Sequence, residues 1–165
     1  MQARRVIGVA VLVIIAFLIV VPPLANGGVK VAMSSSSSVP AEHLYVAVGA
    51  IKAHRAGTQE LAGWSVITNT STLVDLATVN SSETVALGPL PLGQYDTISV
   101  EVMNATAVIN GTSRPAQLMS RVFTVPAPFL VRLGVQTSIM LKVVPELHET
   151  PDIISLELSF TAGET

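Results

Sequence analysis

The sequence predicts an all-β protein: a single antiparallel β-sandwich that follows one hydrophobic N-terminal helix. Three observations support this prediction. Short runs of alternating apolar and polar residues follow one another from about residue 42 to residue 160. Turn-forming Gly, Pro and Asn residues separate these runs. After Pro40, no segment of ten or more residues has the 3.6-residue period of an amphipathic helix.

The most recognisable pattern lies between Gly88 and Val102. Pro89, Pro91 and Gly93 are residue types that favour a tight turn, because they fix or widen the accessible backbone angles. The strand that follows has alternating apolar side chains, which we expect to face the core: Ile98, Val100 and Val102. The stretch therefore predicts a rigid turn that leads into a central strand, and it suggests scaffold rather than active site.

Other strands are predicted from the same alternation and from the turn residues between them. Their ranges are 44–53, 64–68, 71–77, 84–87, 95–102, 106–109, 118–125, 129–135, 137–144 and 153–160. Asn110-Gly111 predicts a type I′ hairpin turn, and Pro126 and Pro128 predict a break between two strands. In the last strand the apolar side chains share one face: Ile154, Leu156, Leu158 and Phe160.

The N-terminus predicts export. Arg4 and Arg5 precede an apolar run from Val6 to Ala25, about the 20 residues that a bilayer-spanning helix needs. One interpretation of residues 1–27 is a retained signal-anchor, with the N-terminus cytoplasmic and the C-terminal domain extracellular. The other is a signal segment that is cleaved, which would make the protein secreted. Both interpretations place the domain outside the cell membrane.

The segment that follows predicts a flexible spacer. Gly27 and Gly28 precede a run of serines from Ser34 to Ser38, and such composition is typical of a flexible linker. We therefore expect residues 28–41 to form a stalk. The β-sandwich ectodomain is expected over residues 42–165.

Composition excludes several classes of function. Arg4 and Arg5 are two of the nine basic residues, so the chain from Val6 onward carries seven basic residues against eleven acidic ones. This balance argues against nucleic-acid binding, which needs clustered Lys and Arg. The chain has no cysteine, which excludes disulfides, thiol catalysis, Cys-ligated zinc and a lipidated Cys anchor.

No enzyme motif, cofactor site or metal site is predicted. The sequence has no G-x-S-x-G motif and no glycine-rich loop that precedes a helix. His43, His54 and His148 lack ligand spacing, so a metal site built on them would need the fold to bring the two ends of the domain together. Asp75 and Asp96 could act as paired carboxylates or calcium ligands, or could simply satisfy turns.

Two aromatic residues leave a carbohydrate-binding role open. Trp64 and Tyr95 could form a platform on which a sugar ring stacks, although packing in the core is the interpretation we favour. Four Asn residues begin an N-x-S/T sequon and are glycosylation candidates: Asn69, Asn80, Asn104 and Asn110. Such acceptors belong on exposed loops of exported proteins.

An ordered set of motifs carries a family resemblance. It comprises a strand ending in basic residues (51–55), Gly63-Trp64, Val-Asp-Leu (74–76), Leu-Pro-x-Gly-x-Tyr-x-x-Ile (90–98) and Asn-Gly (110–111). The set resembles a family of exported prokaryotic β-sandwich domains of unknown function, found in membrane-anchored surface proteins. Its Pro-x-Gly-x-Tyr turn is similar to turns in transthyretin-like and carbohydrate-binding-like sandwiches, and the expected sandwich is of the transthyretin-like or Ig-like kind. The resemblance implies a fold and a surface location but no catalytic residues.

The sequence thus predicts a non-enzymatic, membrane-anchored surface protein with a structural or interaction role. One alternative is an accessory single-span subunit of a membrane complex, with the β-domain capping its outer face. Another is a subunit of an extracellular filament, in which residues 28–40 add a strand to a neighbouring copy. The expected partners are the membrane, other envelope or membrane proteins, further copies of the chain, and carbohydrate.

Overall fold

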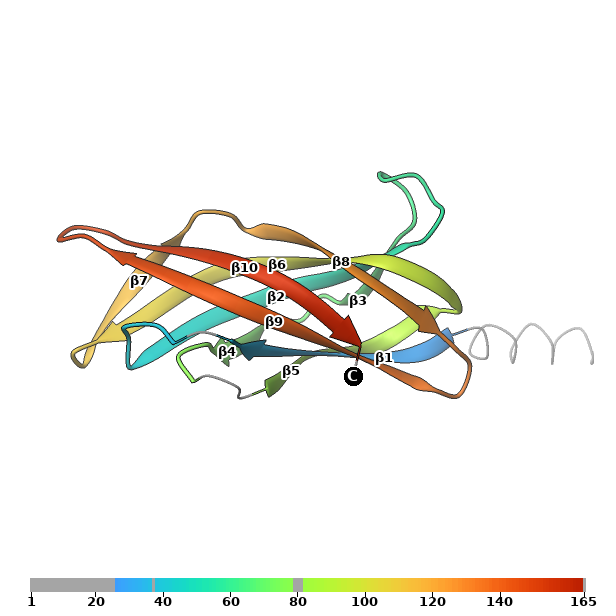
Figure 1. Ribbon diagram of the computed structural model, residues 1–165, viewed down its shortest axis with the longest axis horizontal. Coiled ribbons are helices and arrows are strands. Elements are labelled where there is room, and N and C mark those ends of the chain that lie inside the picture. Colours follow the sequence, from blue (N-terminus) through green and yellow to red (C-terminus); the bar gives the residue numbers. More distant parts are fainter. Residues whose placement is uncertain (1–25, 37, 79–81, 165) are drawn as a thin grey trace, which may run out of the picture.

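The computed structural model describes residues 26–36, 38–78 and 82–164, and this part of the chain is all-β (Figure 1). Its strands are β1 (Asn26–Ser35), β2 (His43–Arg55), β3 (Trp64–Thr68), β4 (Thr72–Asp75), β5 (Ser82–Pro91), β6 (Gly93–Ile109), β7 (Thr112–Leu118), β8 (Val122–Val131), β9 (Gln136–Glu149) and β10 (Ile154–Glu164). Within the described ranges, no helix has the length and apolar character needed to cross a membrane. The predicted N-terminal helix lies outside them.

The strands form one sheet in the order β3-β2-β6-β7-β10-β9-β1-β5, with β4 also pairing β2 and β8 also pairing β6. At its two ends the sheet comes close to itself: a Cβ at Gly88 of β5 would lie 2.1 Å from the Ile67 carbonyl oxygen of β3. The sheet therefore nearly closes into a barrel-like shape. It is mixed rather than antiparallel, because β1 runs parallel to β9, and β7 runs parallel to β10.

The predicted stalk is wrong, because most of it is strand β1. This strand pairs with β5 on one edge and β9 on the other. Its apolar side chains alternate with polar or small ones, and three of them are almost fully buried: Val29, Val31 and Met33. Burial of this face outweighs the flexibility that glycine and serine give the free chain. The folded domain therefore begins at Asn26 and not at residue 42.

The proline-rich segments also differ from the prediction. Pro126 and Pro128 lie inside β8, and Pro89 and Pro91 lie inside β5. Among the described residues, β8 pairs only with β6 and β5 only with β1. Each strand therefore has one edge without ladder hydrogen bonds, where a residue lacking N–H is tolerated. The predicted strands 95–102 and 106–109 are likewise one continuous strand, β6.

The hairpin turn at residues 110–111 is confirmed. Asn110 has a φ of 51° and Gly111 a φ of 70°, the two positive values that a type I′ turn requires. The turn joins β6 to β7 through the Ile109–Thr112 pair. β7 itself was not predicted, because the sequence Thr112–Leu118 contains a proline and no alternating apolar pattern.

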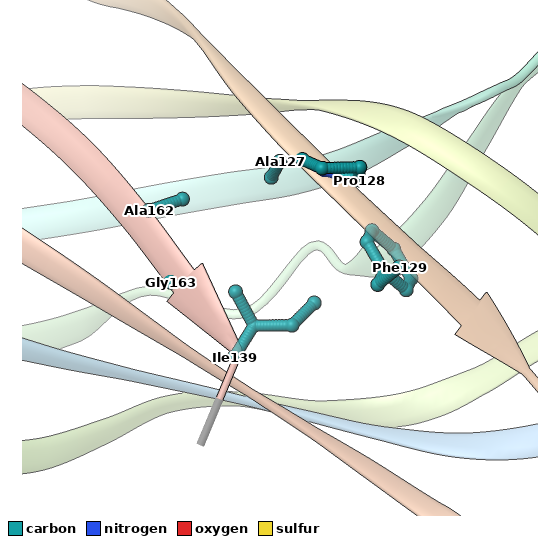
Figure 2. A pocket seen from close by; sticks show the side chains of 6 residues that line it. All are labelled: Ala127, Pro128, Phe129, Ile139, Ala162 and Gly163. Carbon is teal, nitrogen blue, oxygen red and sulfur yellow. The ribbon is translucent and has the colours of Figure 1, made fainter.

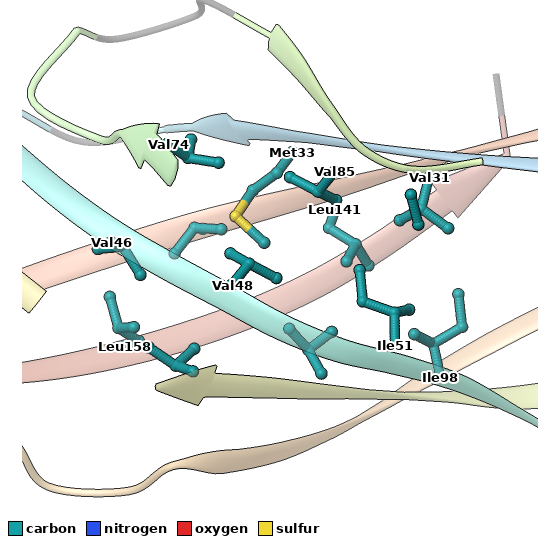
Figure 3. Close-up of a cluster of buried hydrophobic side chains, with 14 of the residues drawn as sticks. Val31, Met33, Val46, Val48, Ile51, Val74, Val85, Ile98, Leu141 and Leu158 are labelled. Atoms are coloured by element: carbon teal, nitrogen blue, oxygen red, sulfur yellow. The ribbon is translucent and has the colours of Figure 1, made fainter. Parts of the chain in front are cut away.

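One hydrophobic core fills the interior of the curved sheet. Side chains from strands far apart in the sequence converge there, including Met33 of β1, Val48 of β2, Ile98 of β6 and Leu141 of β9 (Figure 3). Ile98, Val100 and Val102 are fully buried, as the alternation predicts. Ile154, Leu156 and Leu158 of the last strand are also buried, which confirms its inward face.

Candidate functional site

His54, near the end of β2, is the centre of the most connected polar cluster in the described chain. Its Nδ1 atom lies 2.9 Å from Oδ1 of Asp96, which is on β6. Its Nε2 atom lies 3.2 Å from the Gln59 carbonyl oxygen and 3.2 Å from Oγ1 of Thr58. Because β2 pairs with both β3 and β6 around His54, the ring is held between two neighbouring strands.

In the His54–Asp96 pair, each side chain favours the charged form of the other. The hydrogen bond to Asp96 is the main cause that raises the pKa of His54, and the Gln59 carbonyl adds to it. The same hydrogen bond is the main cause that lowers the pKa of Asp96. An acceptor faces each ring nitrogen, so the geometry favours the doubly protonated imidazolium.

The loop between β2 and β3 closes over the imidazole. Trp64 contacts the His54 ring at a centroid distance of 5.1 Å, and its Nε1 donates to the Glu60 carbonyl at 2.9 Å. Oγ1 of Thr58 donates to the Arg55 carbonyl at 2.6 Å. An open depression of about 390 Å³ lies beside these groups and is also lined by Leu61 and Thr124.

This cluster contains hydroxyl, imidazole and carboxylate groups in sequence, the order of a nucleophilic triad. In such a triad, the imidazole nitrogen facing the hydroxyl must accept a proton. Here Nε2 of His54 also faces the Gln59 carbonyl, and the Thr58 hydroxyl is bonded to a backbone carbonyl. The arrangement therefore fastens the β2–β3 loop to β6 through the enclosed His54 imidazole.

A second His–Asp pair occupies the opposite end of β2. Nδ1 of His43 lies 2.7 Å from Oδ2 of Asp75, and the other carboxylate oxygen accepts from the backbone N–H groups of Leu44 and Ala77, each at 3.0 Å. Burial raises the pKa of Asp75, but the hydrogen bonds from His43 and the two amides outweigh it, so the pKa is lowered overall. Both oxygens of the Asp75 carboxylate therefore form hydrogen bonds with groups of the protein.

The chain matches the family described as "Domain of unknown function (DUF4382)" over residues 26–157. It belongs to the DUF4382 family. The match confirms the predicted resemblance to a domain of unknown function, and it begins where β1 begins. Searches of curated proteins and of solved structures gave no match.

Several sequence candidates are separated in the DUF4382 domain. Asp75 and Asp96 bond to histidines eleven positions apart on β2, a separation of roughly 36 Å along a strand, so they are not paired carboxylates. Tyr95 is 2% exposed, stacks on Phe129 and donates its hydroxyl to the Pro91 carbonyl. It therefore forms no sugar platform with Trp64.

Other acidic groups gather on the β9–β10 hairpin of the DUF4382 domain. Glu146 and Glu157 are cross-strand neighbours, and with His148 they offer ligand atoms within 4.8 Å of one another. All three residues are exposed, and exposed carboxylates commonly lie together without an ion. Glu149 instead pairs with Arg114 at 2.9 Å, and His43 pairs with Asp75.

Three of the four sequons lie in the described chain, and all three Asn residues are exposed. Asn69 is in the β3–β4 loop, Asn104 lies on β6 and Asn110 is in the β6–β7 turn. Asn80 lies outside the described residues.

An apolar cleft of about 260 Å³ lies between β8, β9 and β10 (Figure 2). Its lining residues are Ala127, Pro128, Phe129, Ile139, Ala162 and Gly163. In the described chain, no backbone pairing joins β8 to β10, so the cleft marks a seam where two strand edges face each other. Sequence reasoning missed both this cleft and the His54–Asp96 pair, because each depends on long-range strand register.

Proposed function

We propose that this DUF4382 protein is a non-enzymatic, exported and membrane-anchored surface protein with a structural or interaction role. The observation that carries the proposal is the position of the apolar run Val6–Ala25, which follows Arg4 and Arg5 and leads directly into the folded domain at Asn26. A run of this length is sufficient to cross a bilayer, and the preceding arginines favour a cytoplasmic N-terminus.

The polar clusters support a structural role. Both His–Asp pairs bond to backbone groups and fix loops or strand ends, which is the work of a scaffold. We also propose that this curved sheet is a variant of the β-sandwich fold of the transthyretin-like or Ig-like kind. Partners would bind at exposed loops and at the unpaired edges of β8 and the C-terminal half of β10, which face each other across the apolar cleft.

The exposed sequons support a glycosylated surface. Asn69, Asn104 and Asn110 can each be reached by a transferase, and Asn110 lies at the tip of a hairpin. Glycans there would keep this part of the domain hydrated. Intact-mass measurement of the native protein tests this part: mass added at the sequons supports it, and the bare polypeptide mass from a host that glycosylates N-x-S/T sequons contradicts it.

The position of β1 disfavours assembly by strand donation. Residues 26–35 already lie between β5 and β9 of their own chain, so donation to a neighbour would remove the ladder partner of β5 and leave β9 paired with β10 alone. The alternative of an accessory subunit needs no such rearrangement. Recovery of a stoichiometric complex in mild detergent would favour it over a protein that acts alone.

Protease accessibility on intact cells tests the proposal. A chain with a C-terminal epitope should float with membranes, resist carbonate extraction and lose the epitope when protease is added outside. N-terminal sequencing of the same sample distinguishes a retained anchor from a cleaved signal. Recovery of the full-length chain in the soluble fraction inside the cell would contradict the proposal.

A further inference from the structure

The end of the domain at which β1 begins has a distinct surface; we call it the proximal end. It contains Asn26, the β5–β6 turn at Leu92 and the β8–β9 turn, residues 132–135. Register places these segments together: Asn26 pairs with Pro91, and Gly28 pairs with Gln136. The start of β1 and the β8–β9 turn lie at the same extremity of the long axis (Figure 1).

The β8–β9 turn packs directly against the beginning of β1. A Cβ at Gly27 would lie 2.4 Å from the Arg132 carbonyl oxygen and 2.7 Å from the Val131 side chain. The backbones therefore touch at this point, and β1 cannot emerge from the domain without passing this turn.

The same turn exposes apolar side chains. Leu133 is 54% exposed and Val135 is 53% exposed, on either side of Gly134, whose φ is 70°. Arg132 precedes them, and the turn contains no acidic residue. An exposed apolar pair beside an arginine is the composition of a segment that inserts at a lipid headgroup boundary.

The length of the connecting chain limits how far this turn can be from the apolar run. Only four residues separate Val21, the end of the unbroken apolar sequence, from Asn26. The five residue steps from Val21 to Asn26 span at most about 18 Å when fully extended. Since β1 is part of the domain, residues 26–35 do not form a stalk that would hold the proximal end away from the membrane.

From these observations we propose that the β8–β9 turn rests on the lipid surface, with Leu133 and Val135 in the interface and Arg132 among anionic headgroups. This inference rests on the membrane anchoring proposed above. The opposite end, which we call the distal end, consists of the β6–β7 turn and the β9–β10 turn, residues 150–153. It carries Asp152 and points away from the bilayer.

The chain offers a matched control for testing this. Ile153 in the β9–β10 turn is 52% exposed, nearly the same as Leu133, and lies at the other end of β9, about 43 Å away along the strand. The chain has no cysteine, so Leu133→Cys, Val135→Cys and Ile153→Cys each provide a single labelling site. Each full-length variant would carry an environment-sensitive fluorophore and be reconstituted into phosphatidylcholine–phosphatidylglycerol vesicles.

We expect the labels at positions 133 and 135 to be blue-shifted and quenched severalfold more by nitroxide-bearing lipid than the label at position 153. The label at position 153 should be quenched by aqueous iodide instead. If the chain floats with vesicles but all three labels have the emission and the iodide quenching of a label in water, the proposal of a lipid-facing turn is wrong, while the proposed anchor stands. If the full chain does not float with vesicles, the anchor itself is wrong, and the inference is overturned with it.

Discussion

The proximal and distal ends of the domain are connected by the same long strands but are fixed by different interactions. At the proximal end, Gly27 lies against the Arg132 backbone, and His54 is enclosed with only 10% of its side chain exposed. At the distal end, the His43–Asp75 hydrogen bond and the Arg114–Glu149 ion pair lie at the surface. The comparison teaches that the end nearest the apolar run combines a steric fit at Gly27 with the enclosed His54–Asp96 pair, whereas solvated polar contacts fix the other end.

The largest effect is expected from Gly27→Ala, which tests the steric fit of the proximal end. The new Cβ would collide with backbone atoms of Arg132, so the strand must shift or the turn must open. We expect a loss of about 3 kcal/mol in the free energy of unfolding, at the upper end of overpacking effects. Chemical denaturation measures it.

Gly28→Ala is the matched control, because its Cβ would meet Gln136 at an ordinary distance of 3.9 Å. Its free energy of unfolding should change little. Equal losses of unfolding free energy in the two variants would show that the β8–β9 turn moves to make room for the new Cβ. Steric fit would then not distinguish the proximal end from the distal end.

A somewhat smaller effect is expected from Gly93→Val in the turn that leads into β6. Gly93 has a φ of 147°, which β-branched residues rarely adopt, and its Cβ would lie 3.2 Å from the Arg55 guanidinium. We expect a loss of about 2 kcal/mol from the strained backbone. Gly163→Val is the control, since nothing lies within 4 Å of its Cβ. An unchanged melting temperature for Gly93→Val would contradict the scaffold role of this turn.

At the distal end, Asp75→Asn should cost about 1 kcal/mol, because it weakens hydrogen bonds to His43 and to two backbone amides. The pKa of Asp75 is lowered in the folded state, so its contribution is present above the unfolded value of 3.8 and is lost as pH falls further. The variant and the parent should therefore differ more at pH 7 than at pH 3 in thermal unfolding. Exposed Asp152→Asn is the control, and it should match the parent at both values.

The smallest effect is expected from His54→Gln, and it should depend on pH. The pKa of His54 is raised in the folded state, so its stabilising effect is complete below the unfolded value of 6.5 and is lost as pH rises through the folded pKa. Asp96 must stay ionised, and its lowered pKa ensures this at pH 5. Melting temperatures of the variant and the parent should differ more at pH 5 than at pH 9. A larger difference at pH 9 would mean that the neutral form of His54, and not its charged form, stabilises the fold, which would contradict the prediction. Exposed His148→Gln is the control, and its melting temperature should match that of the parent at both pH values.

The sequence predicted the all-β class and most strands because alternating side chains report directly which face of a strand is buried. Ile98, Val100 and Val102 show this clearly. β1 was missed although Val29, Val31 and Met33 follow the same rule, because the neighbouring glycines and serines suggested a linker. Burial of the alternating apolar face determined the structure of β1, and its glycine and serine content led to the wrong prediction of a linker.

The polar clusters were beyond sequence reasoning for a different reason. His54 and Asp96 are 42 positions apart, and only the register between β2 and β6 brings them together. Glu146 and Glu157 meet in the same way across β9 and β10. Such pairs depend on which strands become neighbours, and a single sequence does not contain that information in any local pattern.

The correction to β1 has a functional consequence. A stalk would separate the domain from the apolar run, whereas a built-in strand places the proximal end within about 18 Å of it. The most direct measurement is hydrogen–deuterium exchange of the backbone amides in residues 27–35 of the native protein. If β1 is part of the folded sheet, the amides that it bonds to β5 and β9 should exchange as slowly as that of Leu141 in β9. Exchange at the rate of an unstructured chain would contradict this, restore the stalk and remove the reason for placing the β8–β9 turn on the membrane.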